Sequence, residues 1–160
     1  MPRTQAIFFT WTTYGIWLRG DMRGWVDDGI VLPADPCIEA ADRARMKHTV
    51  FTLHPNQLFA VGQAMGASLR SRMKLRILAL TIQTWHVHLV VAATSRSLSD
   101  IVKCAKDAVR WHLRLDRPLW TAKYDKRFCF SPSSTRSRVD YVERHNVRVG
   151  LPARPWGFIE

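Results

Sequence analysis

Two histidines separated by one residue are the sharpest chemical feature of this 160-residue sequence. The run Trp85-His86-Val87-His88-Leu89 is apolar and β-branched around the histidines, which predicts a strand. Because side chains i and i+2 of a strand point to the same side, His86 and His88 would face one way and Val87 the other. Two neighbouring neutral imidazoles can form two corners of a divalent-metal site. Surface or hydrogen-bonded core histidines would give the same pattern, so both interpretations stay open.

A tyrosine and a further histidine form the second candidate group. Tyr141 and His145 are four residues apart in a segment that predicts a helix, so they would share one face. Arg138 and Arg148 would lie near that face, where they could neutralise a phosphate. The alternative is an ordinary helix surface on which the tyrosine and the histidine have no chemical role.

The elements that must position these residues follow from hydrophobic periodicity and turn residues. We expect strands at 6–13 and 127–130, a hairpin of two buried strands within 75–94, a long loop at 14–36, and helices at 36–47, 55–73, 98–115 and 132–149. The order strand, helix, strand, strand, helix, strand, helix predicts a single α+β domain over residues 1–160. Its plan is ferredoxin-like (split βαβ), an antiparallel sheet with helices on one face, plus a C-terminal helix that carries Tyr141. The other face of the sheet would be open to substrate.

Two of the expected helices carry further information. Gly62 and Gly66 are one turn apart in the helix at 55–73, where another element could pack closely. The helix at 98–115 combines an apolar face with a basic stripe on another face. The apolar face contains Ile101, Ala105, Ala108, Val109 and His112, and the stripe contains Lys103, Lys106, Arg110 and Arg114.

The charge of the chain is concentrated in one part of the sequence. The formal net charge is +11, from 24 Lys and Arg against 13 Asp and Glu. Residues 1–64 contain six basic and six acidic side chains, so the whole excess lies in residues 65–160. A field of one sign attracts polyanions, which makes nucleic acid the first expected partner. An anionic membrane surface is a weaker expectation, because no basic amphipathic helix carries bulky aromatic residues on its other face. A merely solubilising surface is the third interpretation.

The composition excludes several classes of protein. Apolar residues make up 47% of the chain and charged residues 23%, as in a globular protein. No apolar run approaches the roughly 18–20 residues that span a bilayer, and the N-terminus lacks the pattern of a signal peptide. The three cysteines form no CxxC pair, which argues against a disulfide framework or a zinc knuckle. We therefore expect a reducing, cytoplasmic setting.

The combination of these motifs resembles the HUH endonucleases, and most of all the single-tyrosine REP-associated tyrosine transposases. Their strand motif Asn-His-Val-His-Leu is similar to Trp85-His86-Val87-His88-Leu89. Their helix motif Tyr-x-x-x-Asn-Pro-x-x-Ala-Gly-Leu is similar to the segment from Tyr141 to Leu151, and the opening TTYGIWLRGDMRGWV is similar to the start of one branch. The resemblance spans residues 5–155 and implies an enzyme that nicks and rejoins single-stranded DNA.

The resemblance also implies a role for each motif residue. His86 and His88 would hold Mg²⁺ or Mn²⁺, and Tyr141 would be the catalytic nucleophile that forms a 5′-phosphotyrosine. The third metal ligand in the family is an Asn or Gln four residues after the tyrosine, a position that His145 occupies here. Three imidazoles are softer than a set with an amide oxygen, so they would favour Mn²⁺ or a later transition metal over Mg²⁺.

DNA binding would depend on basic and aromatic side chains. The basic candidates are the stripe (Lys103, Lys106, Arg110, Arg114), then Lys123, Lys126, Arg127, Arg138 and Arg148. Trp11, Trp17 and Trp25 are candidates for stacking on unpaired bases, with a core role as the alternative for each. The expected partner is single-stranded DNA with palindromic or hairpin ends, and the sequence leaves monomer and homodimer open.

Two other functions fit the same residues. One is a domesticated, non-catalytic nucleic-acid-binding module, for which the changed third ligand leaves room. The other is a metal-dependent phosphodiesterase that uses water and forms no covalent intermediate.

Overall fold

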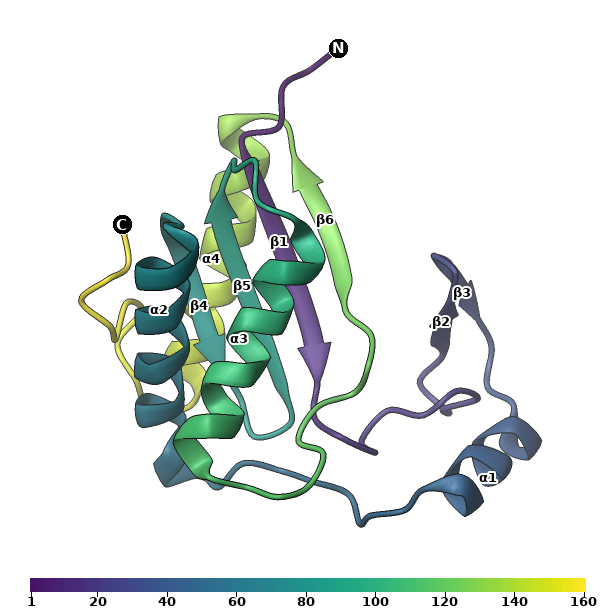
Figure 1. The fold of residues 1–160 in the computed structure, drawn as a ribbon. Helices are drawn as coiled ribbons and strands as arrows, with labels where there is room; N and C mark the ends of the chain where they lie inside the picture. The colour runs from purple at the N-terminus through teal and green to yellow at the C-terminus, as the bar shows by residue number, and fades with distance from the viewer.

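A computed structural model describes all of residues 1–160, and its centre is a four-stranded antiparallel sheet (Figure 1). The strands are β1 (Ala6–Thr12), β2 (Trp25–Asp27), β3 (Ile30–Leu32), β4 (Ile77–Ile82), β5 (His86–Ala92) and β6 (Asp125–Cys129). The helices are α1 (Pro36–Arg45), α2 (Leu58–Met73), α3 (Leu98–Leu113) and α4 (Pro132–Arg148), with a 3-10 turn at Pro55–Gln57 before α2. Most of these bounds agree with the sequence-based expectation to within a few residues.

The order of strands in the main sheet is β4-β5-β1-β6, and every neighbouring pair is antiparallel. The first and third strands of the sheet along the chain are therefore central, and the second and fourth lie at the edges. This is the split βαβ arrangement, so the predicted α+β, ferredoxin-like fold is confirmed.

The two faces of the sheet are covered differently. Alternate residues such as Phe9, Trp11 and Leu89 point toward α2 and α3, which lie side by side on one face and enclose the larger core (Figure 1). Phe8 and Val90 point to the other face and form a smaller core with Val142 of α4. The expectation of an open second face is therefore only partly correct, because α4 buries its apolar side over β4 and β5.

The arm, residues 14–50, lies beyond the end of β1 and contains β2, β3 and α1 (Figure 1). We expected its first part, 14–36, to be a loop, but it contains the short hairpin of β2 and β3. Asp28 and Gly29 connect these strands with φ angles of 47° and 78°. Asp-Gly is the pair that a tight two-residue hairpin turn with two positive φ angles favours, and this local signal was missed.

The helical expectations need one further correction. We expected His112 on the apolar face of α3, but its side chain is exposed. Val102, which we did not expect on that face, is buried. In the last turn of α3 the side that faces the core carries Leu113, which packs against the larger core, so the neighbouring His112 meets solvent.

The C-terminal residues pack closely against α2. A Cβ atom added at Gly62 would overlap the ring of Trp156, and one added at Gly66 would overlap the ring of Phe158. Both rings are buried, and the Trp156 Nε1–H donates to the carbonyl of Phe59 at 2.9 Å. The close approach predicted from the two glycines is therefore real, and the element that makes it is the C-terminal tail.

Replacing Gly62 with alanine is expected to lower the free energy of unfolding by about 1–3 kcal/mol, the usual cost of overpacking a core. The gain in helix propensity, about 1 kcal/mol, would only partly offset the displacement of Trp156. Urea denaturation measures the change. Gly157→Ala is the matched control, because nothing lies near its added Cβ. Equal stability of the two variants would contradict the packing described here.

Candidate metal and tyrosine site

Strand β5 places His86 and His88 on the same face of the sheet, as their spacing predicts. Their ring centroids are 4.7 Å apart, and both side chains are buried. Val87, between them, points into the larger core. The two imidazoles thus lie on the face that α4 partly covers.

Helix α4 brings Tyr141 and His145 to the same point. The His145 ring centroid is 4.8 Å from that of His88 and 5.6 Å from that of His86. The Tyr141 ring centroid is 5.3 Å from that of His88 and 4.6 Å from that of His145. One nitrogen from each of the three histidines lies within 4.8 Å of the other two. The four residues singled out from two distant motifs therefore form one cluster within one chain.

Buried contacts on both sides of His145 hold α4 in register over the sheet. Val142 is fully buried in the smaller core. Asn146 is also buried, and its Nδ2 donates to the carbonyls of Leu80 at 2.9 Å and Ala153 at 3.0 Å. Asn146 stands where the resembled family has proline, so this departure supplies a link between α4 and β4 that a proline could not make.

Hydrogen bonds orient two of the imidazoles. The Nδ1 of His145 lies 2.9 Å from the carbonyl oxygen of Tyr141, one turn earlier. Because a carbonyl only accepts, Nδ1 carries the proton and Nε2 keeps its lone pair in the neutral ring. The Nδ1 of His88 lies 2.8 Å from the hydroxyl of Thr10 on β1, which fixes that ring as well. Such partners are typical of histidines that bind a metal through the other nitrogen.

The surroundings of His86 and His88 keep both rings neutral. Burial lowers the pKa of His86 to about 4, and the nearby His145 contributes further. Burial also lowers the pKa of His88 to about 3, with smaller effects of His86, His145 and Arg138. Neutral imidazoles are the form that binds metal, so no proton must leave these two residues at neutral pH.

A divalent metal ion fits this cluster. The Nδ1 of His86 is buried and has no hydrogen-bond partner, although burial of a polar atom without a partner is costly. His86 and His88 each offer one nitrogen, and His145 offers the third. Three imidazole nitrogens favour Mn²⁺ or a later transition metal over Mg²⁺. The histidine triad (His86, His88, His145) could therefore hold such an ion.

The phenol of Tyr141 stands at the border between the cluster and solvent. Its side chain is 37% exposed, so a large substrate can reach the hydroxyl. The ring contacts Phe8 edge-on, with centroids 6.1 Å apart, and the guanidinium of Arg138 lies 5.0 Å from the Phe8 centroid. Arg127 lies on the same face because it pairs with Phe8 in the sheet. Two cations thus lie beside Phe8 on the tyrosine face, and Arg127 is also paired with Asp125 at 3.3 Å.

A series of tilted aromatic contacts, here called the stack, joins the arm to the histidine triad. The Trp85 ring centroid is 4.1 Å from that of His86 and 5.9 Å from that of Trp17. The guanidinium of Arg23 lies 3.9 Å from the Trp17 centroid and is held by Asp21. Trp85 was not among the residues predicted to be functional. The signal that could have identified it is the change from asparagine, which the resembled family has at this position, to an aromatic residue.

The three tryptophans proposed for base stacking have different surroundings. Trp11 is buried in the larger core, so its core alternative is the correct one. Trp17 is half-buried in the stack with Trp85, and its Nε1–H donates to the carbonyl of Gly24 at 2.8 Å. Trp25 is half-buried on the β2–β3 hairpin.

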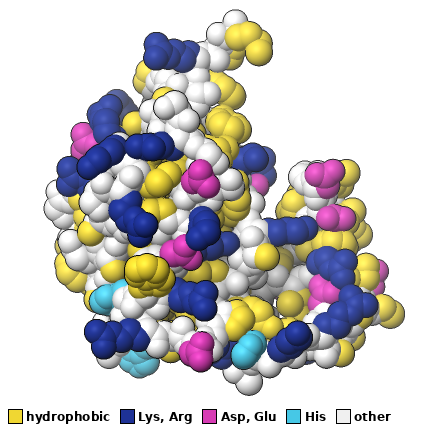
Figure 2. Space-filling model, in the orientation of Figure 1, with side chains coloured by type: hydrophobic (Ala, Val, Ile, Leu, Met, Phe, Trp, Pro, Cys, Tyr) yellow, Lys and Arg dark blue, Asp and Glu magenta, His cyan; other side chains and the backbone are white.

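The predicted DNA-binding residues are divided between the two faces of the sheet. Arg127 and Arg138 lie on the tyrosine face, and Arg148 is exposed at the last residue of α4. Five others belong to the opposite side: Lys103, Lys106 and Arg110 on α3, Arg114 just after it, and Lys126, which pairs with Phe9. Lys123 lies in the segment between α3 and β6 and is paired with Asp27 of the arm at 3.9 Å. Figure 2 looks onto this opposite side and shows Lys and Arg side chains gathered over it.

The comparisons with known proteins show the fold. No protein-family model matches the sequence, and no curated protein matches it. The structure of a REP-associated tyrosine transposase bound to a REP hairpin superposes with a TM-score of 0.54, at 14% identity over 94% of this chain and 72% of that one. A candidate transposase from Deinococcus radiodurans R1 gives a TM-score of 0.44, at 17% identity over 90% of this chain and 92% of that one. At this identity the first likeness establishes a shared fold.

None of the helices is both long enough and apolar enough to cross a bilayer.

The low pKa values of His86 and His88 predict a loss of stability in acid. Between pH 6.5 and about 4 the unfolded chain protonates both histidines while the folded chain does not, so the free energy of unfolding falls as pH falls. Each site contributes a slope of up to about 1.4 kcal/mol per pH unit in this window. Urea denaturation of the metal-free protein at pH 7, 6 and 5 measures it. His88→Gln should flatten the profile, whereas the same substitution at the exposed His112 should not.

Proposed function

We propose that this chain is a metal-dependent transposase-type enzyme that nicks and rejoins single-stranded DNA through a 5′-phosphotyrosine. The observation that carries the proposal is the position of the Tyr141 phenol beside three imidazoles that could hold one divalent ion. The nucleophile and all three ligands come from one chain, which supports a site that needs no second subunit. We also propose that residues 1–160 act as one domain.

In the proposed reaction the Tyr141 oxygen attacks the scissile phosphorus. A bond forms between phosphorus and the phenol oxygen, the bond from phosphorus to the 3′ oxygen breaks, and the departing oxygen gains a proton while the phenol proton passes to water. The bound ion would supply Lewis-acid stabilisation of the charge that builds up on the phosphate oxygens. The phosphotyrosine conserves the energy of the broken bond, so a free 3′-hydroxyl can displace the tyrosine and rejoin a strand without a nucleoside triphosphate.

The residues around the phenol suit a phosphodiester substrate. Arg138 and Arg127 place positive charge on the tyrosine face, where each can bind a phosphate oxygen. Phe8 and Thr10 hold the rings of Tyr141 and His88 from the strand beneath them, which limits the movement of the reacting groups. These contacts support a positioned nucleophile in preference to a water-using phosphodiesterase.

The proposed substrate is DNA with hairpin ends. The solved transposase of the same fold is bound to a REP hairpin, and this chain carries an excess of 11 positive charges. A hairpin presents both a duplex stem and an unpaired strand, and cations on both faces of the sheet could contact the two parts.

Replacing Tyr141 with phenylalanine is expected to abolish the covalent adduct, because it removes only the attacking oxygen. The measurement uses hairpin DNA with a single-stranded flank, labelled at either end, with Mn²⁺, on a denaturing gel. Wild type should give a protein–DNA adduct, and Tyr141→Phe should reduce it at least about 1,000-fold while still binding DNA.

Tyr14→Phe is the matched control for this experiment, since it removes one hydroxyl from the arm and should keep wild-type adduct formation. Cleavage by wild type without an adduct would replace the proposal with a water-using phosphodiesterase. Binding without any cleavage would replace it with a non-catalytic DNA-binding module.

Replacing His145 with glutamine is expected to shift the metal preference from Mn²⁺ toward Mg²⁺, because an amide oxygen is a harder ligand than an imidazole nitrogen. The rise in melting temperature on adding each ion measures binding without requiring activity. Wild type should respond to Mn²⁺ far more than to Mg²⁺, and the variant should narrow this difference by about tenfold or more in apparent affinity. An unchanged ratio, equal to that of the surface control His112→Gln, would show that His145 is not a ligand.

A further inference from the structure

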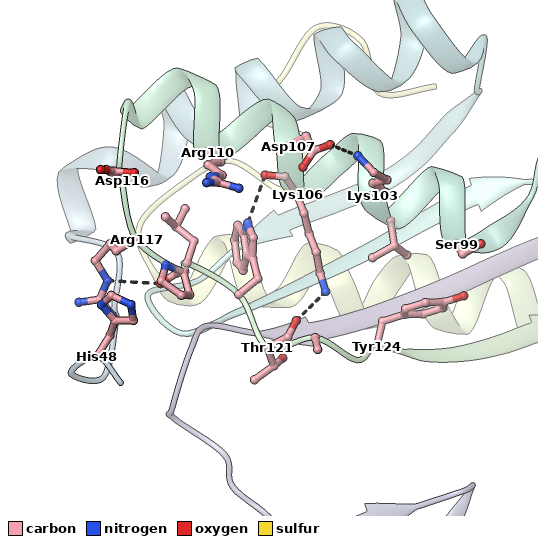
Figure 3. Close-up of a pocket in the computed structure, with 15 residues that line it drawn as sticks. His48, Ser99, Lys103, Lys106, Asp107, Arg110, Asp116, Arg117, Thr121 and Tyr124 are labelled. Atoms are coloured by element: carbon pink, nitrogen blue, oxygen red, sulfur yellow. Dashed lines mark hydrogen bonds and ion pairs between the residues drawn. The ribbon is translucent and has the colours of Figure 1, made fainter. Parts of the chain in front are cut away.

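A cleft of about 670 Å³ lies on the side of the sheet opposite to the histidine triad. Its walls are α3 and residues 116–124, which connect α3 to β6 (Figure 3). The volume falls within the range of small-molecule and cofactor sites, roughly 300–1,000 Å³, but the cleft is open to solvent. An open trough of this size suits a section of an extended polymer better than an enclosed ligand.

The lining combines positive charge with aromatic rings. The lining includes four cationic side chains (Lys103, Lys106, Arg110 and Arg117) and two carboxylates (Asp107 and Asp116). Lys103 is paired with Asp107 at 2.6 Å, and Arg117 is bonded to Thr49 of the arm. Arg110 is exposed and has no ion pair in the chain, so its guanidinium is available to an anion from outside.

Trp120 and Tyr124 supply half-buried aromatic surface in the same cleft. The Trp120 ring lies edge-on to Trp11, with centroids 6.3 Å apart, and its Nε1–H donates to the carbonyl of Lys106 at 3.3 Å. Tyr124 packs against Phe9, with centroids 6.1 Å apart. Rings held in this way lose little freedom on stacking with a base, and cations beside stacking surfaces are the chemistry that binds single-stranded nucleic acid.

Lys106 shapes the cleft and is not free to bind phosphate. Its ammonium group donates to the carbonyl of Thr121 at 2.7 Å (Figure 3) and to that of Lys123 at 3.3 Å. Burial lowers its pKa to about 8, in keeping with a side chain directed inward. Lys106 thus ties the connecting segment to α3 and keeps the rings of that segment in place.

The cleft and the histidine triad meet at one end of the sheet. Thr12 pairs with His86 of β5 on one side, and on its other side its carbonyl accepts from the backbone N–H and the hydroxyl of Thr121, both at 3.1 Å. Residues 119–121 therefore extend the edge of the sheet beyond the start of β6, two strand spacings or about 10 Å from His86. A single strand of DNA that crosses this edge would pass directly from the histidine triad to the cleft.

We propose that this cleft binds the single-stranded flank of the DNA whose scissile phosphate lies at Tyr141, with Arg110 on a phosphate and with Trp120 and Tyr124 on bases. The proposal rests on the proposed function for the identity of the strand, but binding in the cleft needs neither metal nor cleavage. The flank would wrap around the sheet edge at Thr12 and Thr121, so both basic faces would contact one molecule.

Fluorescence anisotropy with labelled oligothymidylate of about 12 nucleotides, in EDTA, tests binding in the cleft. Arg110→Glu should weaken binding about tenfold. Because one phosphate contact is lost, the slope of log K against log salt should also become shallower by about 0.7 or more. Arg72→Glu changes the charge equally on the exposed end of α2 and should have little effect. Equal effects of the two substitutions would overturn the proposal, as would tighter binding of oligouridylate or polyglutamate than of oligothymidylate.

Two further measurements test the route of the strand. Arg110→Glu should weaken binding of a hairpin with a single-stranded flank but not of the blunt hairpin, and an equal effect on both would overturn the proposal. Photo-crosslinking from iodouracil in the flank should label residues 116–126, whereas labelling confined to the tyrosine face would overturn it. Tyr141→Phe should keep this crosslink, so a failed nicking reaction and a failed cleft are separate results.

Discussion

The position of α4 across the sheet is the constraint on which the candidate site depends. His86 and His88 belong to a strand in the middle of the chain, whereas Tyr141 and His145 come from a helix near its end. The burial of Val142 and the two hydrogen bonds of Asn146 fix both the rotation of α4 and its position along β4. A rotation of α4 by one residue, about 100°, would turn both functional side chains away from the strand. The geometry of the site is therefore a consequence of core packing on the less covered face.

Burial of the histidines has two opposing effects. It lowers the pKa of His86 and His88, so both rings are neutral and able to bind metal at physiological pH. It also leaves the Nδ1 of His86 without a hydrogen-bond partner, which costs stability. Three other buried polar atoms of the protein also lack a partner, but only the Nδ1 of His86 belongs to the histidine triad, where a bound metal ion would offset its cost.

Local patterns were enough to predict the main sheet and the helices, because β1, β4 and β5 are strongly apolar and three of the four helices begin at a side-chain cap. The same patterns predicted that His86 and His88 share a face and that Tyr141 and His145 share another. The meeting of these faces, and their assignment to an ion and a nucleophile, came from a family resemblance, since no periodicity reports which side of a sheet a terminal helix will cover. The inward turn of Lys106 and the role of Asn146 depend on contacts between distant segments, and a single sequence does not contain those.

The separation of the cations by the sheet has a consequence for DNA binding. If Arg127 and Arg138 contact one part of a substrate and Arg110 another, the contacts are linked through a flexible strand. The second contact then forms at a high effective concentration once the first has formed, which raises the overall affinity without any strong individual contact. A duplex is too stiff to turn around a sheet edge that lies only about 10 Å from His86, whereas a single strand bends there easily. If the chain has the proposed function, this arrangement of charge would therefore favour substrates with an unpaired segment next to the reacting phosphate.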